Sequence, residues 1–157
     1  MIISGKDISL KIKNQLRLEV EEIKKSYPRL PKLVVILVGD NQASQTYVRN
    51  KERGCEYIGI ESDLLHHGSS FSEKELLQEI DKLNKDDNVD GILVQLPLPD
   101  HIDEQKVLNA IDPSKDVDGF HPDNIASLFL GEKSLVPCTP KGMLVLLDEI
   151  GYDLEGK

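Results

Sequence analysis

The segment GDNQASQTYVRNK contains two polar side chains that could transfer protons. Tyr47 and Lys51 are four residues apart there, so they share one face if the segment is helical. A phenol beside an ammonium group suits proton transfer, because burial or a nearby positive charge brings an amine into the working range of a general base. The same spacing also arises when a tyrosine ring merely packs over the aliphatic part of a lysine side chain on a solvent-exposed helix. Spacing alone leaves both interpretations open.

A second segment, GILVQLPLP, ends an apolar run with an amide. Gln95 interrupts this run, and the alternate prolines Pro97 and Pro99 cannot continue a central strand. The chain must therefore leave the sheet and form a rigid, extended rim. A buried amide at such a place needs partners. Gln95 either serves a site or satisfies loop carbonyls.

A third segment, KDVDGFH, carries two carboxylates beside a flexible glycine. A carboxylate there could accept paired N–H bonds from a planar heterocycle with a guanidine-like edge. Asp116 or Asp118 could equally cap a turn, and we expect that role for at least one of them.

Composition disfavours several other classes of function. With 19 Lys and Arg against 28 Asp and Glu, the 157-residue chain has a formal charge of −9, so we expect no binding to nucleic acid or anionic membranes. Its four histidines and two cysteines lack metal-ligand spacing, so we expect no metal. G-x-G-x-x-G and P-loop motifs are absent, so no nucleotide-binding loop is predicted. Cys55 and Cys138 form no C-x-x-C pair, which favours a reduced, cytoplasmic location.

Apolar strands alternating with amphipathic helices predict the scaffold that positions these segments. Short apolar runs predict strands at 33–38 and 91–96, and a further strand is assigned to residues 60–66 between the helices. Spacings of three and four, capping residues and a capping box at 72–75 predict helices at 7–25, 43–57, from 73 onward, 103–111, 124–130, and from an N-cap at Thr139 to 150. We therefore predict an α/β fold: a three-layer, open, mostly parallel sheet with helices on both faces. Ligands bind beyond the carboxyl ends of strands in such folds, where the three polar segments begin.

Four blocks of the sequence together resemble the methylenetetrahydrofolate dehydrogenase/methenyltetrahydrofolate cyclohydrolase family of one-carbon metabolism. They are VGDNQASQTYVRNKERGCEYIGI, DGILVQLPLP, PSKDVDGFHPDN and PCTPKG, at residues 38–60, 90–99, 113–124 and 137–142. They occur in the expected order, and the similarity extends from about residue 3 to the end. Enzymes of this family look like two-domain proteins, in which a folate-binding α/β domain precedes a Rossmann domain that binds NADP or NAD.

The resemblance implies a role for each matching residue. Lys51 matches the catalytic lysine, and Gln95 the glutamine that hydrogen-bonds it. Tyr47 matches the tyrosine that packs on and orients the folate, and Asp118 the carboxylate that holds the pterin edge. Further substrate contacts are implied at the rim of the folate cleft, by Ser44, Pro97, Leu98 and Pro137.

The resemblance also implies that the two domains of the intact enzyme have different roles. Residues 1–150 would form the folate-binding catalytic domain, and 151–157 would begin the connection to a Rossmann domain that this chain lacks. The intact enzyme would oxidise 5,10-methylenetetrahydrofolate to the methenyl compound with NADP and hydrolyse that product to 10-formyltetrahydrofolate. This chain alone is expected to lack the dehydrogenase activity.

The expected setting is a cytoplasmic homodimer that serves one-carbon metabolism and purine biosynthesis. Its substrate would be a polyglutamylated folate, which is an anion, so the folate cleft must be locally basic despite the acidic chain. We expect Arg49, Lys51 and Arg53 to supply that charge.

Two alternatives come from other classes of protein. A non-catalytic folate-binding module would keep the cleft without turnover, and a flavodoxin-like regulatory domain would bind no folate at all.

Overall fold

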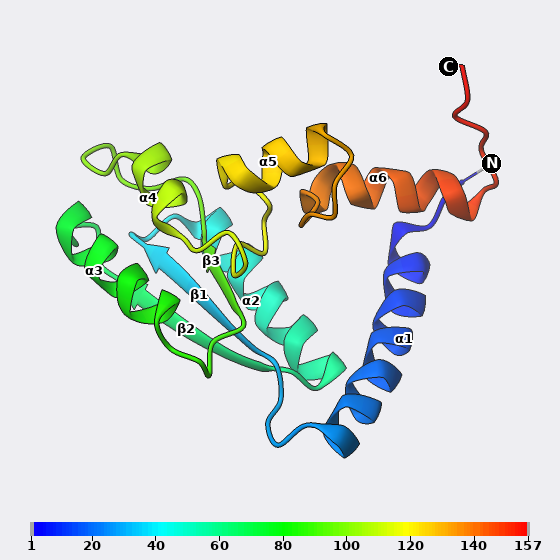
Figure 1. Ribbon diagram of the computed structural model, residues 1–157, viewed down its shortest axis with the longest axis horizontal. Coiled ribbons are helices and arrows are strands. Elements are labelled where there is room, and N and C mark those ends of the chain that lie inside the picture. The colour runs from blue at the N-terminus through cyan, green and yellow to red at the C-terminus, as the bar shows by residue number, and fades with distance from the viewer. Residues whose placement is uncertain (1, 157) are drawn as a thin grey trace.

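A parallel sheet of three strands lies at the centre of the computed structural model, which describes residues 2–156 (Figure 1). In chain order the elements are α1 (Gly5–Ser26), β1 (Lys32–Val38), α2 (Gln42–Ile58), β2 (Glu61–His67), α3 (Glu73–Asn84), β3 (Gly91–Val94), α4 (Glu104–Ala110), α5 (Pro122–Phe129) and α6 (Cys138–Glu149). Every predicted helix and strand therefore has a counterpart, and most bounds agree within about two residues.

The sheet has the strand order β2-β1-β3. Both pairings are parallel, with Lys32 opposite Glu61 and Leu33 opposite Gly91. β1 is the middle strand and its last five residues are buried, as its continuous apolar sequence predicts. The prediction of an open α/β fold with a parallel sheet is confirmed.

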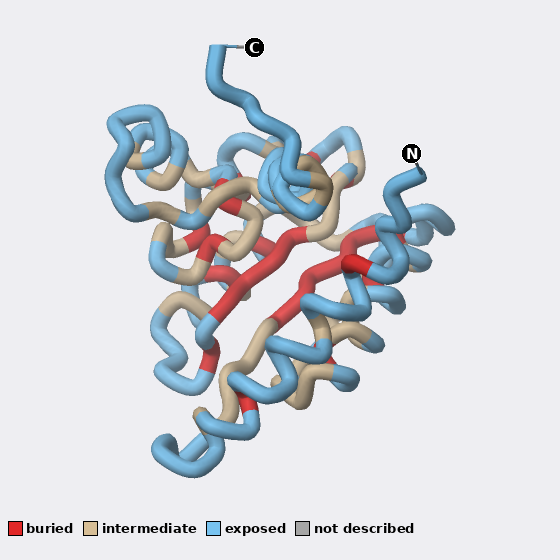
Figure 2. Tube along the Cα trace, turned by 90° about the vertical axis from the view of Figure 1, so that its right-hand side faces the viewer, coloured by how far each residue is buried: buried red, intermediate tan, exposed pale blue. Residues whose placement is uncertain are grey.

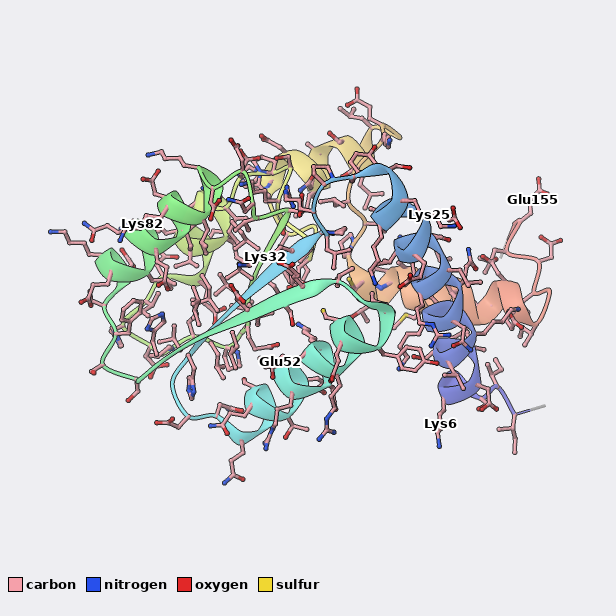
Figure 3. The ribbon with its side chains drawn as sticks, turned by 90° about the horizontal axis from the view of Figure 1, so that it is seen from below. Lys6, Lys25, Lys32, Glu52, Lys82 and Glu155 are labelled. Carbon is pink, nitrogen blue, oxygen red and sulfur yellow. The ribbon has the colours of Figure 1, made fainter. Side chains whose placement is uncertain are left out.

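Alternate residues of the central strand build two separate cores. Val34 and Ile36 pack in one cluster with Leu76 of α3, on the face that α3 and α4 cover. Val35 packs in another with Val48 of α2. Figure 3 shows α3 and α2 on opposite sides of the strands, and this arrangement confirms the three layers.

The chain leaves β3 earlier than we expected. The predicted strand over 91–96 ends at Val94, although the backbone N–H of Gln95 still donates to Ile36 O at 2.9 Å. The Leu96–Pro97 peptide bond that follows is cis. Gln95 therefore lies just beyond the sheet, at the carboxyl end of the strand.

Helix starts followed their capping signals in one case and departed from them in another. Ser72 forms the predicted capping box with Glu75 at the start of α3. The prediction of Thr139 as an N-cap is wrong, because α6 begins at Cys138, two residues before the expected first helical residue, with Pro137 in the N-cap position. Pro137 has a φ of −50° and a ψ of 130°, and the helix starts directly after it without a side-chain cap.

Within the described part of the chain, helices α1, α5 and α6 contribute no residue to the two core clusters. α1 packs against α2, and the far end of α6 reaches α1 (Figure 1). α1 is exposed along most of its length (Figure 2), and its buried residues are Ile8 and Val20. None of the helices within residues 2–156 combines the length and apolar composition of a membrane span.

Candidate active site

Helix α2 carries the predicted proton-handling pair away from the carboxyl end of β1. Asn41 starts this helix by accepting a hydrogen bond from the backbone N–H of Ser44 at 3.0 Å. Tyr47 is 63% exposed, whereas Lys51, one turn later, is half-buried. The two side chains therefore differ in environment: an aromatic ring open to a ligand precedes an amine that is directed into the protein.

The amine of Lys51 contacts the amide at the end of β3. Lys51 Nζ donates to Gln95 Oε1 at 3.2 Å, and Gln95 Nε2 donates to the carbonyl of Leu96 at 2.7 Å. Ser44 Oγ donates to the same carbonyl at 3.4 Å. The nitrogen of Gln95 therefore satisfies a loop carbonyl, as one interpretation expected, and its oxygen binds Lys51; a role of Gln95 in a site stays a prediction.

The loop that carries the two aspartates runs beside β3. Ile92 N donates to Lys115 O at 2.7 Å, and Ile92 pairs with Asp116 in a parallel bridge. Asp118, two residues further on, is half-buried. Burial raises the pKa of the Asp118 carboxyl, the nearby charge of Lys51 lowers it, and the charge of Asp116 raises it further. The pairing with β3 thus brings this carboxylate within the field of the lysine.

The two aspartates have different environments. Asp116 is 2% exposed and accepts hydrogen bonds from Gly119 N at 3.1 Å, His121 N at 2.7 Å and Asn124 Nδ2 at 3.1 Å. Asp118 has no side-chain hydrogen bond within residues 2–156. Our expectation that at least one of the two caps a turn is confirmed for Asp116, and Asp118 is the carboxylate left free to bind a ligand.

A close backbone approach brings the segment before α6 against this loop. Gly119 has a φ of +69°, and a Cβ placed on it would lie 2.6 Å from Leu135 O and 3.1 Å from Pro137 N. The predicted contact residue Pro137 therefore borders the loop of Asp118. Gly119 and Asn124 were not among the predicted site residues, although a glycine directly after Asp118 was a visible signal of a left-handed turn.

The rim residues Pro97 and Leu98 are oriented differently from each other. Pro97 is exposed, whereas Leu98 is 7% exposed and packs in the core cluster of α3 and α4. Neighbouring side chains of an extended segment point to opposite sides, so one faces solvent and the other the core. We therefore no longer assign the Leu98 side chain a contact with substrate.

Helix geometry separates the three basic residues that we expected to make the site basic. At 3.6 residues per turn, side chains two apart point about 160° away from each other. Arg49 and Arg53 are exposed on a different side of α2 from Lys51. Lys51 is therefore the basic residue of α2 that reaches Gln95, and a contribution of Arg49 and Arg53 to the charge of the cleft stays a prediction.

Side chains of the types that bind metals form no cluster in the part of the chain that the structure describes. Residues 2–156 contain no group of three or more His, Cys, Asp or Glu side chains arranged to hold a metal ion.

Together, the fold and the site define an α/β domain with a lysine, an amide and a free carboxylate beyond its parallel strands. The family model described as tetrahydrofolate dehydrogenase/cyclohydrolase, catalytic domain, matches residues 3–118. The chain belongs to this family, which confirms the resemblance seen in the sequence.

Curated relatives and solved structures agree with this assignment. "Bifunctional protein FolD" of Oceanobacillus iheyensis is 50% identical over 99% of this chain and 54% of its own length. A crystal structure of the bifunctional FolD enzyme methylenetetrahydrofolate dehydrogenase/cyclohydrolase from Campylobacter jejuni has a TM-score of 0.96 and 49% identity, covering 100% of this chain and 56% of that one. The Trypanosoma brucei enzyme, solved with NADP and an inhibitor, has a TM-score of 0.96 and 33% identity, covering 100% of this chain and 54% of that one.

The chain spans about half the length of the curated relatives that it matches.

Proposed function

We propose that this chain forms the folate-binding catalytic domain of a bifunctional methylenetetrahydrofolate dehydrogenase/methenyltetrahydrofolate cyclohydrolase. One observation carries the proposal: Lys51 Nζ lies 3.2 Å from Gln95 Oε1, within the field of a half-buried Asp118 that has no hydrogen bond from residues 2–156. The bifunctional relatives, about 50% identical across this chain, support the same activity.

Hydrolysis of the methenyl compound requires a base for the attacking water. In the proposed step the water oxygen bonds to the cationic methenyl carbon, and Lys51 Nζ takes the proton that this oxygen loses. Because Lys51 donates one N–H to Gln95, the amide fixes the amine and leaves its lone pair for the water. Cleavage of the carbon–N5 bond then yields 10-formyltetrahydrofolate: a proton returns to N5, the hydroxyl group loses its remaining proton as the carbonyl forms, and one proton is released to solvent overall.

Asp118 and Tyr47 would hold the substrate in place for this step. The free carboxylate of Asp118 can accept two N–H bonds from the 2-amino-4-oxo edge of the pterin ring. The exposed ring of Tyr47 offers an aromatic face on which the folate stacks. Ser44, Pro97 and Pro137 would border the ligand, with Ser44 also holding the Leu96 carbonyl.

The residues of this chain do not fit an NADP site. The turn between β1 and α2 has a single glycine, Gly39, followed by Asp40 and Asn41, and the exit from β3 contains prolines. Neither offers the glycine-rich loop that a pyrophosphate requires. We therefore assign no part of the hydride transfer to these residues and propose that NADP binds outside residues 1–150, with 151–157 leading toward its domain.

The wider setting follows the same proposal. We propose a cytoplasmic enzyme of one-carbon metabolism and purine biosynthesis that acts as a homodimer on polyglutamylated folate. Cys55 and Cys138 are both free thiols, which supports a reducing compartment.

Absorbance of 5,10-methenyltetrahydrofolate tests the proposed hydrolysis. This chain should accelerate its loss over buffer, and Lys51→Met should remove the acceleration. Lys82→Met is the matched control, because this exposed lysine of α3 lies on the other side of the sheet (Figure 3). Equal rates for wild type and Lys51→Met would refute the role of Lys51. Folate binding without turnover would favour a non-catalytic module, and no folate binding would favour a flavodoxin-like regulatory domain.

A further inference from the structure

We propose that Asp116 is a positioning residue for substrate binding: its buried carboxylate fixes the turn that aims Asp118 at the folate. The inference rests on the proposed function, and it adds a residue that itself never touches the substrate. Asp116 is 2% exposed, so no ligand can reach its carboxylate.

The hydrogen bonds of Asp116 bridge the backbone segment that contains Asp118. Asp116 Oδ1 accepts from Gly119 N at 3.1 Å, and Oδ2 accepts from His121 N at 2.7 Å. The backbone on the carboxyl side of Asp118 is therefore tied to a side chain on its amino side. Asn124 Nδ2 donates to Oδ2 at 3.1 Å and to Pro113 O at 2.8 Å, which joins this turn to α5.

The chain before Asp116 is anchored on the opposite side. Lys115 Nζ donates to the carbonyls of Leu83, Asn84 and Asp86 at 2.8 to 3.0 Å, where α3 ends. Its own carbonyl accepts from Ile92 N at 2.7 Å. Adjacent residues thus bind the loop to α3, β3 and α5. The Asp118 side chain makes no such hydrogen bonds within residues 2–156, so the anchored residues on either side of it determine its orientation.

The arrangement depends on a carboxylate because three donors meet two acceptor oxygens. An asparagine at position 116 keeps the shape but replaces one oxygen with an NH2 group, which cannot accept. Placing that NH2 at Oδ2 would lose two bonds, whereas placing it at Oδ1 would lose only the bond from Gly119 N. Asp116→Asn should therefore release the turn directly beside Asp118 while the rest of the loop stays anchored.

The chain contains a matched control carboxylate at the opposite end of β3. Asp90 also accepts three hydrogen bonds on two oxygens, from Arg29 Nη2 at 2.9 Å, Arg29 Nη1 at 2.6 Å and Lys32 N at 2.8 Å. It directly precedes β3, at the amino end of the strand. Asp90→Asn should leave the site unchanged and cost less stability than Asp116→Asn, because the Asp90 side chain is 44% exposed.

Calorimetric titration with tetrahydrofolate under reducing conditions tests the inference. We expect Asp116→Asn to raise the Kd about tenfold and Asp90→Asn to change it less than twofold, while both lower the urea midpoint. Asp118→Asn should weaken binding at least as much as Asp116→Asn. The double variant at 116 and 118 should bind no more weakly than Asp118→Asn alone, since Asp116 acts through Asp118.

The outcomes separate the inference from the proposed function. No binding by the wild-type chain would overturn the proposed function, and the inference with it. Normal wild-type binding with equal Kd values for Asp116→Asn and Asp90→Asn would overturn the inference alone, as would losses that add in the double variant. If Asp116→Asn does not fold, Asn124→Ala removes one donor to Oδ2 and should raise the Kd about threefold; an unchanged Kd would contradict the inference.

Discussion

Gly119→Ala is the substitution whose cost follows most directly from the backbone. Gly119 has a φ of +69°, a left-handed conformation that a residue with a Cβ adopts at a cost of about 1 kcal/mol. The new Cβ would also lie 2.6 Å from Leu135 O and 3.1 Å from Pro137 N. Because both atoms belong to the backbone, the two segments must separate, which adds about 1–3 kcal/mol. The total loss of unfolding free energy is about 3 kcal/mol.

Urea denaturation followed by circular dichroism measures this loss. With an m value of about 2 kcal/mol per M, the midpoint should fall by about 1.5 M. Gly131→Ala is the matched control, because Gly131 has a φ of +75° and a Cβ added there would meet no atom of the described chain within 4 Å. Its loss should stay near 1 kcal/mol.

The two glycine variants should also differ in ligand binding. Separation of the Gly119 turn from the Pro137 segment displaces Asp118, so Gly119→Ala should weaken tetrahydrofolate binding while Gly131→Ala does not. Equal stability losses in the two variants would refute the close approach, and unchanged folate binding by Gly119→Ala would refute its link to the site.

Two further substitutions test the core and the electrostatics. Ile36→Ala, at a side chain with 0% exposure in the central strand, should cost about 2–5 kcal/mol of unfolding free energy by urea titration; a loss below about 1 kcal/mol would contradict the burial of this side chain in the core. Burial raises the pKa of Asp118 above 3.8, so the folded state keeps this proton to a higher pH than the unfolded state does. The stability of the protein therefore falls as the pH rises from 3.8 through the higher pKa of the folded state. Asp118→Asn should therefore have a higher Tm than wild type at pH 7, with the difference shrinking as the pH approaches 3.8; a lower Tm at pH 7 would show a stabilising charge.

The periodicity of the sequence was sufficient to predict the scaffold. Continuous apolar residues in β1 and spacings of three and four in the helices report burial on particular faces, and burial determines these elements. Ends of elements depend on tertiary contacts instead. β3 stopped at Val94 where the chain turns toward Pro97, and α6 began directly after Pro137, which lies against Gly119.

The site was predicted less completely, because several residues are distinguished only by distant partners. Asp116 and Asp118 are equivalent in a local sequence pattern, and the donors that bury Asp116 include Asn124, eight residues later. Leu98 likewise belongs to the core, because Val107 of α4, later in the chain, packs in the same cluster. The expected contact of Gln95 with Lys51 spans 44 residues and came from the resemblance to a family, not from spacing.

Hydrolysis and binding measured on the same Lys51→Met protein test the central claim most directly. A general base contributes about 100- to 10,000-fold to a proton transfer, so at saturating 5,10-methenyltetrahydrofolate the rate above background should fall by at least about 100-fold. The Kd for tetrahydrofolate should change less than about threefold, because Asp118 and Tyr47 hold that ligand. A variant that keeps the wild-type rate, or that loses binding and turnover together, would contradict the assignment of Lys51 as the base.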